Sequence, residues 1–265
     1  MNKLEEPLAQ LRHMASRAWA AVPVGAGLLC CICGRKVRRF LPYRGTWLGM
    51  PPVLTEGGVI GSDILNFACP ACGCHARERH LWLYLQACGI LQAMGGTRIL
   101  HLAPEMHLQR LIAGAAPRVY VLGDLYPSRA DIRRIDLLDI DFPEHHFDLV
   151  IANHVLEHVS DDTRALREIL RVLRPGGKAI LQTPYASRLP RKFEDPSITS
   201  EEARLHAYGQ EDHCRLYGAD FPDFVASFGF VSHAATHAAL LPEVDTRRMG
   251  VNAQEPFLLF EKPAA

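Results

Sequence analysis

The sequence predicts a doubly wound α/β fold with a mostly parallel, seven-stranded sheet, preceded by a small cysteine-rich module. Two observations lead to this prediction. From residue 98 onward, short apolar runs alternate with segments whose apolar residues recur at helical spacing, which is typical of a parallel sheet covered by helices. Before that point, six of the eight cysteines fall in two tight clusters. A chain of 265 residues is long enough for one core and a small satellite module.

The cysteine-rich module is predicted from the clusters "CCICG" and "CPACGC". They contain Cys30-x-x-Cys33 and Cys69-x-x-Cys72, and each pair is followed by glycine. Four thiolates on two tight turns suit a structural zinc ion, with no open coordination position left for chemistry. Cys31 and Cys74 are spare and could replace a ligand. An iron–sulfur or redox role is the alternative, and disulfides are disfavoured without a secretion signal.

The segments around this module set the expected domain boundaries. Residues 1–20 are expected to form a short amphipathic helix, followed by the metal module within residues 1–76. A helix is expected over residues 77–94, because apolar residues recur at helical spacing until Gly95 and Gly96 end it. It opens the second domain, residues 77–265.

Seven strands are expected in this second domain. They cover residues 98–103, 118–124, 133–139, 147–153, 178–184, 230–237 and 256–262, with helices over 106–115, 160–173 and 220–229. The run "FDLVIAN" is continuously apolar, as expected of a strand covered on both faces. No helix separates the last two strands, so we expect them to be an antiparallel pair at one edge of the sheet.

Ligands of such sheets bind beyond the carboxyl ends of the strands. Asp124 follows the second strand, about 20 residues after the first loop, where an acid can accept hydrogen bonds from ribose hydroxyls. The pair Asp136-Leu137 follows the third strand and suits an adenine amino group and ring face. Other candidates at strand ends are His101, Ala103, Glu105, Leu125, Asn153, His154 and Tyr185.

Residues 136–185 closely resemble class I S-adenosylmethionine-dependent methyltransferases of the small-molecule type. The resemblance rests on "FDLVIANHVLEH" and "LRPGGKAIL". It implies a Rossmann-like fold over residues 97–262 and S-adenosylmethionine as cofactor. It also implies that Asp124 holds the ribose, that Asp136 holds the adenine, and that Asn153 and His154 line the methionine end. The cysteine clusters followed by "LWLYL" and "LHLAPE" further resemble a bacterial subgroup with a cysteine-rich N-terminal module.

The first cofactor loop departs from this family. Relatives have a glycine-rich loop there, whereas this chain has "HLAPE". Glycines let the backbone approach the cofactor closely. We therefore expect His101 and Glu105 to touch or border the cofactor through their side chains, with Ala103 small enough for partial approach.

The acceptor is expected to meet the segment 188–217, which is long enough to form a lid. Within it, Asp212 and His213 could act as orienter and general base, and His154 is the alternative base. Candidate substrate residues are Arg77, Arg79, Tyr185, Asp212, Arg215 and Tyr217. The spacing of His154 and His158 around Glu157 resembles a metal motif only superficially, and we interpret His158 as a packing or capping residue.

Three functions compete at this stage. The leading hypothesis is a methyltransferase for a small or medium-sized acceptor. An RNA methyltransferase that docks its substrate through the basic module is the second, since residues 1–90 carry 10 Lys and Arg against 5 Asp and Glu. A net charge of zero and the lack of an N/D-P-P-Y/F motif weigh against it. The third is a catalytically degenerate, zinc-dependent binding or scaffold protein.

The sequence also bears on location. No apolar run reaches the ~18–20 residues that span a membrane, and the first residues lack a signal-peptide layout. We expect a cytoplasmic protein without a membrane partner.

Overall fold

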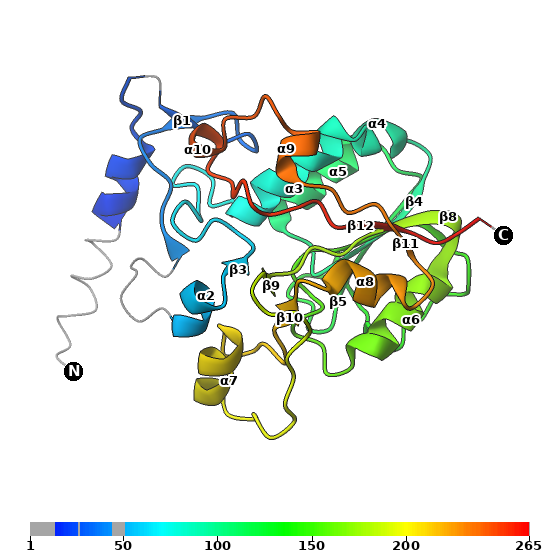
Figure 1. Ribbon diagram of the computed structural model, residues 1–265. Coiled ribbons are helices and arrows are strands. Elements are labelled where there is room, and N and C mark those ends of the chain that lie inside the picture. The colour runs from blue at the N-terminus through cyan, green and yellow to red at the C-terminus, as the bar shows by residue number, and fades with distance from the viewer. Residues whose placement is uncertain (1–13, 26, 44–50, 265) are drawn as a thin grey trace.

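The computed structural model describes residues 14–25, 27–43 and 51–264 (Figure 1). Residues 14–21 are helical. The rest of the helix expected over residues 1–20 lies outside the described residues.

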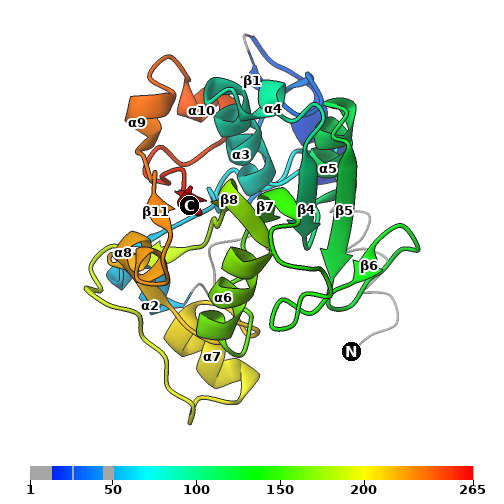
Figure 2. The ribbon, with the colours of Figure 1, turned by 90° about the vertical axis from the view of Figure 1, so that its right-hand side faces the viewer.

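A seven-stranded sheet forms the centre of the molecule, as predicted (Figures 1 and 2). Its strand order is β11-β12-β8-β7-β4-β5-β6. β12 runs antiparallel to both neighbours, and the other pairs are parallel, which confirms the expected antiparallel edge. The strands are β4 (Arg98–Leu102), β5 (Val119–Asp124), β6 (Arg133–Arg134), β7 (Phe147–Ala152), β8 (Leu173–Ile180), β11 (Val231–Ser232) and β12 (Leu259–Glu261).

Helices cover both faces of this sheet, because the central strands are apolar on both sides. Along β4, Ile99 packs on one face with Leu81 and Ile112, whereas Leu100 packs on the other with Leu166 and Phe221. The first face carries α3 (Ala76–Ala87), α4 (Ile90–Ala93) and α5 (Met106–Gly114). The second carries α6 (Asp162–Val172) and α8 (Phe221–Ala226) (Figure 2). No helix of the described ranges is long and apolar enough to cross a membrane.

One helix differs from its prediction. The pattern over residues 77–94 predicts a single helix, but the structure breaks it at Gly89, whose φ of 67° is left-handed. Glycine adopts this conformation without strain, so the chain turns there. The helices α9 (His237–Leu240) and α10 (Thr246–Met249) were also not expected.

The N-terminal segment packs over the carboxyl ends of the sheet. It contains β1 (Leu28–Leu29), β2 (Lys36–Val37), α2 (Pro52–Glu56) and β3 (Val59–Ile60). β3 joins β9 (Tyr185–Ala186) and β10 (Tyr217–Gly218) in a second, three-stranded sheet, near α7 (Glu201–Tyr208) (Figure 1). The N-terminal segment and the segment after β8 therefore form one continuous roof above the strand ends.

Candidate active site

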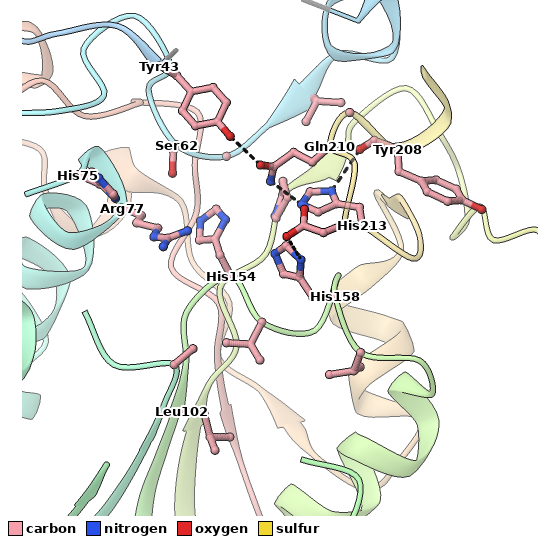
Figure 3. A pocket seen from close by; sticks show the side chains of 18 of the residues that line it. Tyr43, Ser62, His75, Arg77, Leu102, His154, His158, Tyr208, Gln210 and His213 are labelled. Atoms are coloured by element: carbon pink, nitrogen blue, oxygen red, sulfur yellow. Dashed lines mark hydrogen bonds and ion pairs between the residues drawn. The ribbon is translucent and has the colours of Figure 1, made fainter. Parts of the chain in front are cut away.

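A cavity of about 1240 Å³ lies between the strand ends and this roof (Figure 3). Its floor is made by the loops after β4, β5, β6 and β7. Its other walls come from Tyr43, from residues 54–77 and 208–213, and from the stretch before β12. The lining residues that the sequence prediction had placed here are Arg77, Ala103, Asp124, Leu125, Asp136, Leu137, His154, Asp212 and His213.

Two acids at the floor hold the positions expected for cofactor contacts. Oδ1 of Asp124 accepts a hydrogen bond from the Tyr126 amide at 2.8 Å, and Oδ1 of Asp136 accepts one from the Leu138 amide at 2.9 Å. These local turns orient the carboxylates. Among the described residues, the second oxygen of each has no hydrogen-bond partner and is available to a ligand.

The glycine-free first loop keeps a glycine-like conformation. Ala103 has a φ of 47°, and its amide donates to the Gly123 carbonyl at 2.8 Å. Ala103 therefore reaches the cavity wall in the left-handed conformation that glycine favours. Pro104 is not among the lining residues.

His101 and Glu105, which were expected to touch or border the cofactor, do not line the cavity. Both side chains are buried outside the cavity lining, where His101 bridges the Tyr120 hydroxyl at 2.8 Å and Glu105 at 3.3 Å. Glu105 also accepts from Nδ2 of Asn153 at 2.7 Å, and Nε of Arg77 lies 3.5 Å away. Burial opposes the charge of Glu105, but His101 and Arg77 outweigh it and lower the pKa of Glu105. Asn153, also expected to line the cofactor, instead belongs to this buried support.

His154 stands between two buried carboxylates. Its Nδ1 lies 3.4 Å from Oε1 of Glu157, and its Nε2 lies 3.6 Å from Oε1 of Glu255. Burial disfavours a charged ring, but the two acids raise the pKa of His154 to about 9. His154 is thus protonated near neutral pH, which does not fit its predicted role as a general base.

The predicted Asp212–His213 pair does not form. Asp212 Oδ2 instead lies 3.2 Å from Nδ1 of His158. His213 donates from Nδ1 to the Tyr208 carbonyl at 3.3 Å, and burial lowers its pKa. His213 is therefore neutral, and it lines the cavity beside His158 (Figure 3).

Four other predicted substrate residues lie outside the cavity lining. Arg79 is fully buried and donates to the carbonyls of Asn66, Phe67, Cys74, Met249 and Gly250. Arg215 is also fully buried and donates to the carbonyls of Leu156, Val159 and Ser160. Tyr217 donates to Asp162 at 3.0 Å, and Tyr185 lies in β9. Arg79, Arg215 and Tyr217 were predicted from their polar side chains, but these side chains make hydrogen bonds inside the fold instead of facing the cavity.

Sequence reasoning missed several lining residues. They are His158 and the side chains contributed by the N-terminal segment and by α7, including Tyr43, Ser62, Phe67, His75 and Tyr208 (Figure 3). Their contacts join parts of the chain far apart in sequence, and no local pattern indicates them.

The four predicted zinc ligands lie together. The Sγ atoms of Cys30, Cys33, Cys69 and Cys72 are all within 4.8 Å of one another, and Cys30 and Cys72 are 3.9 Å apart. Tetrahedral zinc with Zn–S bonds of about 2.3 Å requires sulfur separations of roughly 3.8 Å. Cys74 is 3.3 Å from Cys30, whereas Cys31 points to the Arg79 carbonyl. No disulfide joins any cysteine.

The two turns that carry these cysteines have the same hydrogen bonds. The Gly34 amide donates to the Cys30 carbonyl, and the Gly73 amide donates to the Cys69 carbonyl, both at 2.8 Å. The Cys30 amide donates to the Arg35 carbonyl at 3.0 Å, and the Cys69 amide donates to the Cys74 carbonyl at 2.9 Å. Two equivalent knuckles present four thiols to one point, so the donor set fits a tetrahedral metal ion.

Known proteins with similar sequences are methyltransferases. Residues 107–181 match the family described as a methyltransferase domain. A probable S-adenosylmethionine-dependent methyltransferase of Mycolicibacterium smegmatis is 30% identical over 125 residues, which are 47% of this chain and 45% of that protein. A 2-phytyl-1,4-naphtoquinone methyltransferase of Synechococcus elongatus is 40% identical over 67 residues, 24% of this chain and 28% of that one. The chain thus spans less than half the length of either relative.

A solved S-adenosylmethionine-dependent methyltransferase of Mesorhizobium loti aligns with 65% of this chain and 95% of its own, at 18% identity and a TM-score of 0.45. The sheet order and the cavity at the strand ends define a Rossmann-like domain of the nucleotide-binding kind. Residues 107–181 thus match a methyltransferase domain, and this part of the chain is similar to S-adenosylmethionine-dependent methyltransferases.

Proposed function

We propose that the protein transfers the methyl group of S-adenosylmethionine to a small or medium-sized acceptor inside the cavity. The observation that carries this proposal is one continuous cavity that has Asp124 and Asp136 on its floor and His154, His158 and His213 on its wall. Pockets for single ligands are typically about 300–1,000 Å³. At about 1240 Å³, the cavity has room for the cofactor and an acceptor.

The residues on the floor suit the adenosyl group. The carboxylate of Asp124 would accept hydrogen bonds from the ribose hydroxyls, and that of Asp136 from the adenine amino group. Leu125 and Leu137 would flank the ring. Arg77, whose Nε is held near Glu105, would face the carboxylate of the methionine part. Bound cofactor would supply an activated methyl group, so the protein mainly has to orient the acceptor.

The histidine wall suits the acceptor. His154 carries a proton and would bind an electron-rich acceptor group rather than accept its proton. The neutral ring of His213 is the part of the wall that can take up a proton. Deprotonation of the acceptor is therefore assigned to His213.

The cysteine cluster is proposed to hold a structural zinc ion through Cys30, Cys33, Cys69 and Cys72. Four thiols converge and leave no coordination position for a substrate. Eight free cysteines also suit a reducing compartment, so we propose that the protein works in the cytoplasm.

Binding of S-adenosylhomocysteine by calorimetry tests the cofactor site. Wild type is expected to bind, and Asp124→Ala and Asp136→Ala are each expected to weaken binding at least ~10-fold, since a hydrogen bond to a charged group contributes about 1.5–3 kcal/mol. Asp223→Ala is the matched control, because Asp223 is exposed on α8 outside the lining. A folded wild type that binds no S-adenosylhomocysteine would refute the proposal.

Labelled cofactor then tests the acceptor class. Incubation with a cell extract separated by size is expected to place the labelled methyl group in the small-molecule fraction. Label that enters RNA instead would replace our proposal with the RNA methyltransferase hypothesis.

A further inference from the structure

Besides the cysteine cluster, the described residues contain a second group with metal-ligand geometry. A carboxylate oxygen of Glu157 and one ring nitrogen each of His158 and His213 lie within 4.8 Å of one another. Glu157 and His158 follow β7, and His213 lies between α7 and β10, so the fold brings the group together from two segments. Both histidines face the cavity (Figure 3). We propose that Glu157, His158 and His213 bind one divalent transition-metal ion at the cavity wall.

The first support is the orientation of the two rings. Asp212 Oδ2 lies 3.2 Å from Nδ1 of His158, and the Tyr208 carbonyl accepts from Nδ1 of His213 at 3.3 Å. The carbonyl keeps the ring proton of His213 on Nδ1 and leaves its Nε2 with a lone pair, and the carboxylate of Asp212 faces Nδ1 of His158. Metal-binding histidines are oriented in this way, with the second nitrogen donating to a carboxylate or a carbonyl.

The side chain of Gln210 supports the same tautomer. Its amide nitrogen lies 2.6 Å from Nε2 of His213, and its oxygen accepts from the Tyr43 hydroxyl at 2.9 Å. The amide group therefore donates to Nε2, which must carry the lone pair. A bound ion would displace this amide nitrogen.

The second support is a buried oxygen without a partner. Glu157 is 1% exposed, and its Oε2 accepts from the Thr183 hydroxyl at 3.0 Å. Its Oε1 has no hydrogen-bond partner, although His154 Nδ1 lies 3.4 Å away outside hydrogen-bond geometry. The charged ring of His154 balances the charge of Glu157 but makes no hydrogen bond to this oxygen, so a metal ion would give the buried oxygen a direct partner.

Hydrogen bonds to backbone carbonyls hold the loop that carries Glu157 and His158. Arg215 donates to the carbonyls of Leu156 and Val159, on either side of the two ligands. The Cys214 amide donates to the carbonyl of Glu157 at 2.8 Å, which ties this loop to the chain next to His213. The ligand positions are therefore set by backbone contacts, and only small side-chain shifts are needed to close around an ion.

Two imidazoles and one carboxylate leave open coordination positions, as in catalytic rather than structural metal sites. Because the open side faces the cavity, the ligand class is an acceptor with a hydroxyl or carboxylate oxygen. With the ion bound, the histidines are ligands rather than proton acceptors, and the ion itself would favour the ionised form of the acceptor. This role rests on the proposed methyl transfer, whereas the binding of the ion does not.

Cobalt(II) is a probe that separates this site from the cysteine cluster. Full-length protein that holds one zinc ion per chain, with excess zinc removed, is titrated with Co²⁺ and followed by visible absorption. We expect one ion per chain with a nitrogen and oxygen ligand spectrum, without the thiolate-to-cobalt charge-transfer band that exchange into the cysteine cluster would produce.

His158→Asn and His213→Asn are each expected to weaken Co²⁺ binding more than ~10-fold, and Asp212→Asn by roughly 10-fold as an orienting residue. His206→Asn is the matched control, because His206 is exposed on α7 and bonds only its own helix. Binding of S-adenosylhomocysteine, measured on the same proteins, shows that the variants fold and tests the methyltransferase proposal separately. Absence of a Co²⁺ spectrum in zinc-loaded wild type, or unchanged Co²⁺ binding by both folded histidine variants, would overturn the metal site.

Discussion

At the scale of single residues, two non-glycine residues at the cavity adopt left-handed backbone conformations. Ala103 has a φ of 47° and His154 a φ of 57°, and both line the cavity. Such conformations carry strain of about 1–2 kcal/mol for residues with a Cβ atom. The strain lies in the loops after β4 and β7, at the wall of the cavity.

We expect Ala103→Gly to stabilise the protein by about 0.5–1 kcal/mol. Glycine removes the left-handed strain, and its greater freedom in the unfolded chain offsets part of that gain. Urea denaturation measures the change. Ala113→Gly, at an exposed helical position of α5, is the control and should destabilise by about 1 kcal/mol. A loss of stability in Ala103→Gly would show that Ala103 is not strained.

Glu255 makes stability depend on pH. Burial opposes its charge, but His154 and His80 outweigh burial and lower its pKa to about 2. The unfolded value is about 4.3. A lowered pKa stabilises the fold above the unfolded value, and this contribution is lost as the pH falls toward 2.

Glu255→Gln should therefore be less stable than wild type by on the order of 3 kcal/mol at pH 7. The difference should shrink between about pH 4.3 and about pH 2, as measured by denaturation at a series of pH values. Glu243→Gln, at an exposed position, provides the comparison. A difference that stays constant over this range would contradict the charged state of Glu255.

At the scale of elements, local patterns predicted the sheet but not the contacts across it. The apolar runs of β4 and β7 are strong signals, because both faces of each strand are buried. The antiparallel edge was predicted because no helical pattern was found between the last two strands, although α9 and α10 lie there. The break at Gly89 was missed, since an apolar helical pattern continues on both sides of it. No local sequence pattern indicates that β3 pairs with β9. Contacts between residues far apart in sequence are missed for the same reason, and Asp212 was therefore assigned to the adjacent His213 instead of to His158.

Arg79 shows how one side chain can join several elements. It lies on α3 and bonds carbonyls of the second knuckle and of the end of α10. Arg79→Met should leave these buried carbonyls without partners and cost about 3 kcal/mol or more. Thermal unfolding would measure this, with Arg110→Met on the exposed side of α5 as control. Equal stability of the two variants would contradict the anchoring role.

At the scale of the whole molecule, the cavity belongs to two parts of the chain at once. The strand ends supply the floor, and residues 61–67 supply a wall directly before Cys69 and Cys72. The thiolate cluster therefore supports the cavity without lining it.

Removal of the proposed zinc should consequently affect both stability and ligand binding. We expect chelation to remove several kcal/mol of stability, a drop in Tm on the order of 10 °C, and to weaken S-adenosylhomocysteine binding. Cys33→Ser should have a similar effect, whereas Cys88→Ser, outside the cluster, should not. Metal-free protein with unchanged Tm and unchanged binding would argue against a structural zinc ion.

The pairing of β3 with β9 has a consequence for biosynthesis. The chain emerges from the ribosome N-terminus first, so both knuckles are complete long before residues 185–186 have been made. The cysteine module can thus fold early, but it has no sheet partner until most of the domain has emerged. The nascent protein can hold the proposed zinc ion before the cavity is enclosed, and the roof is complete only after residues 217–218 have been made.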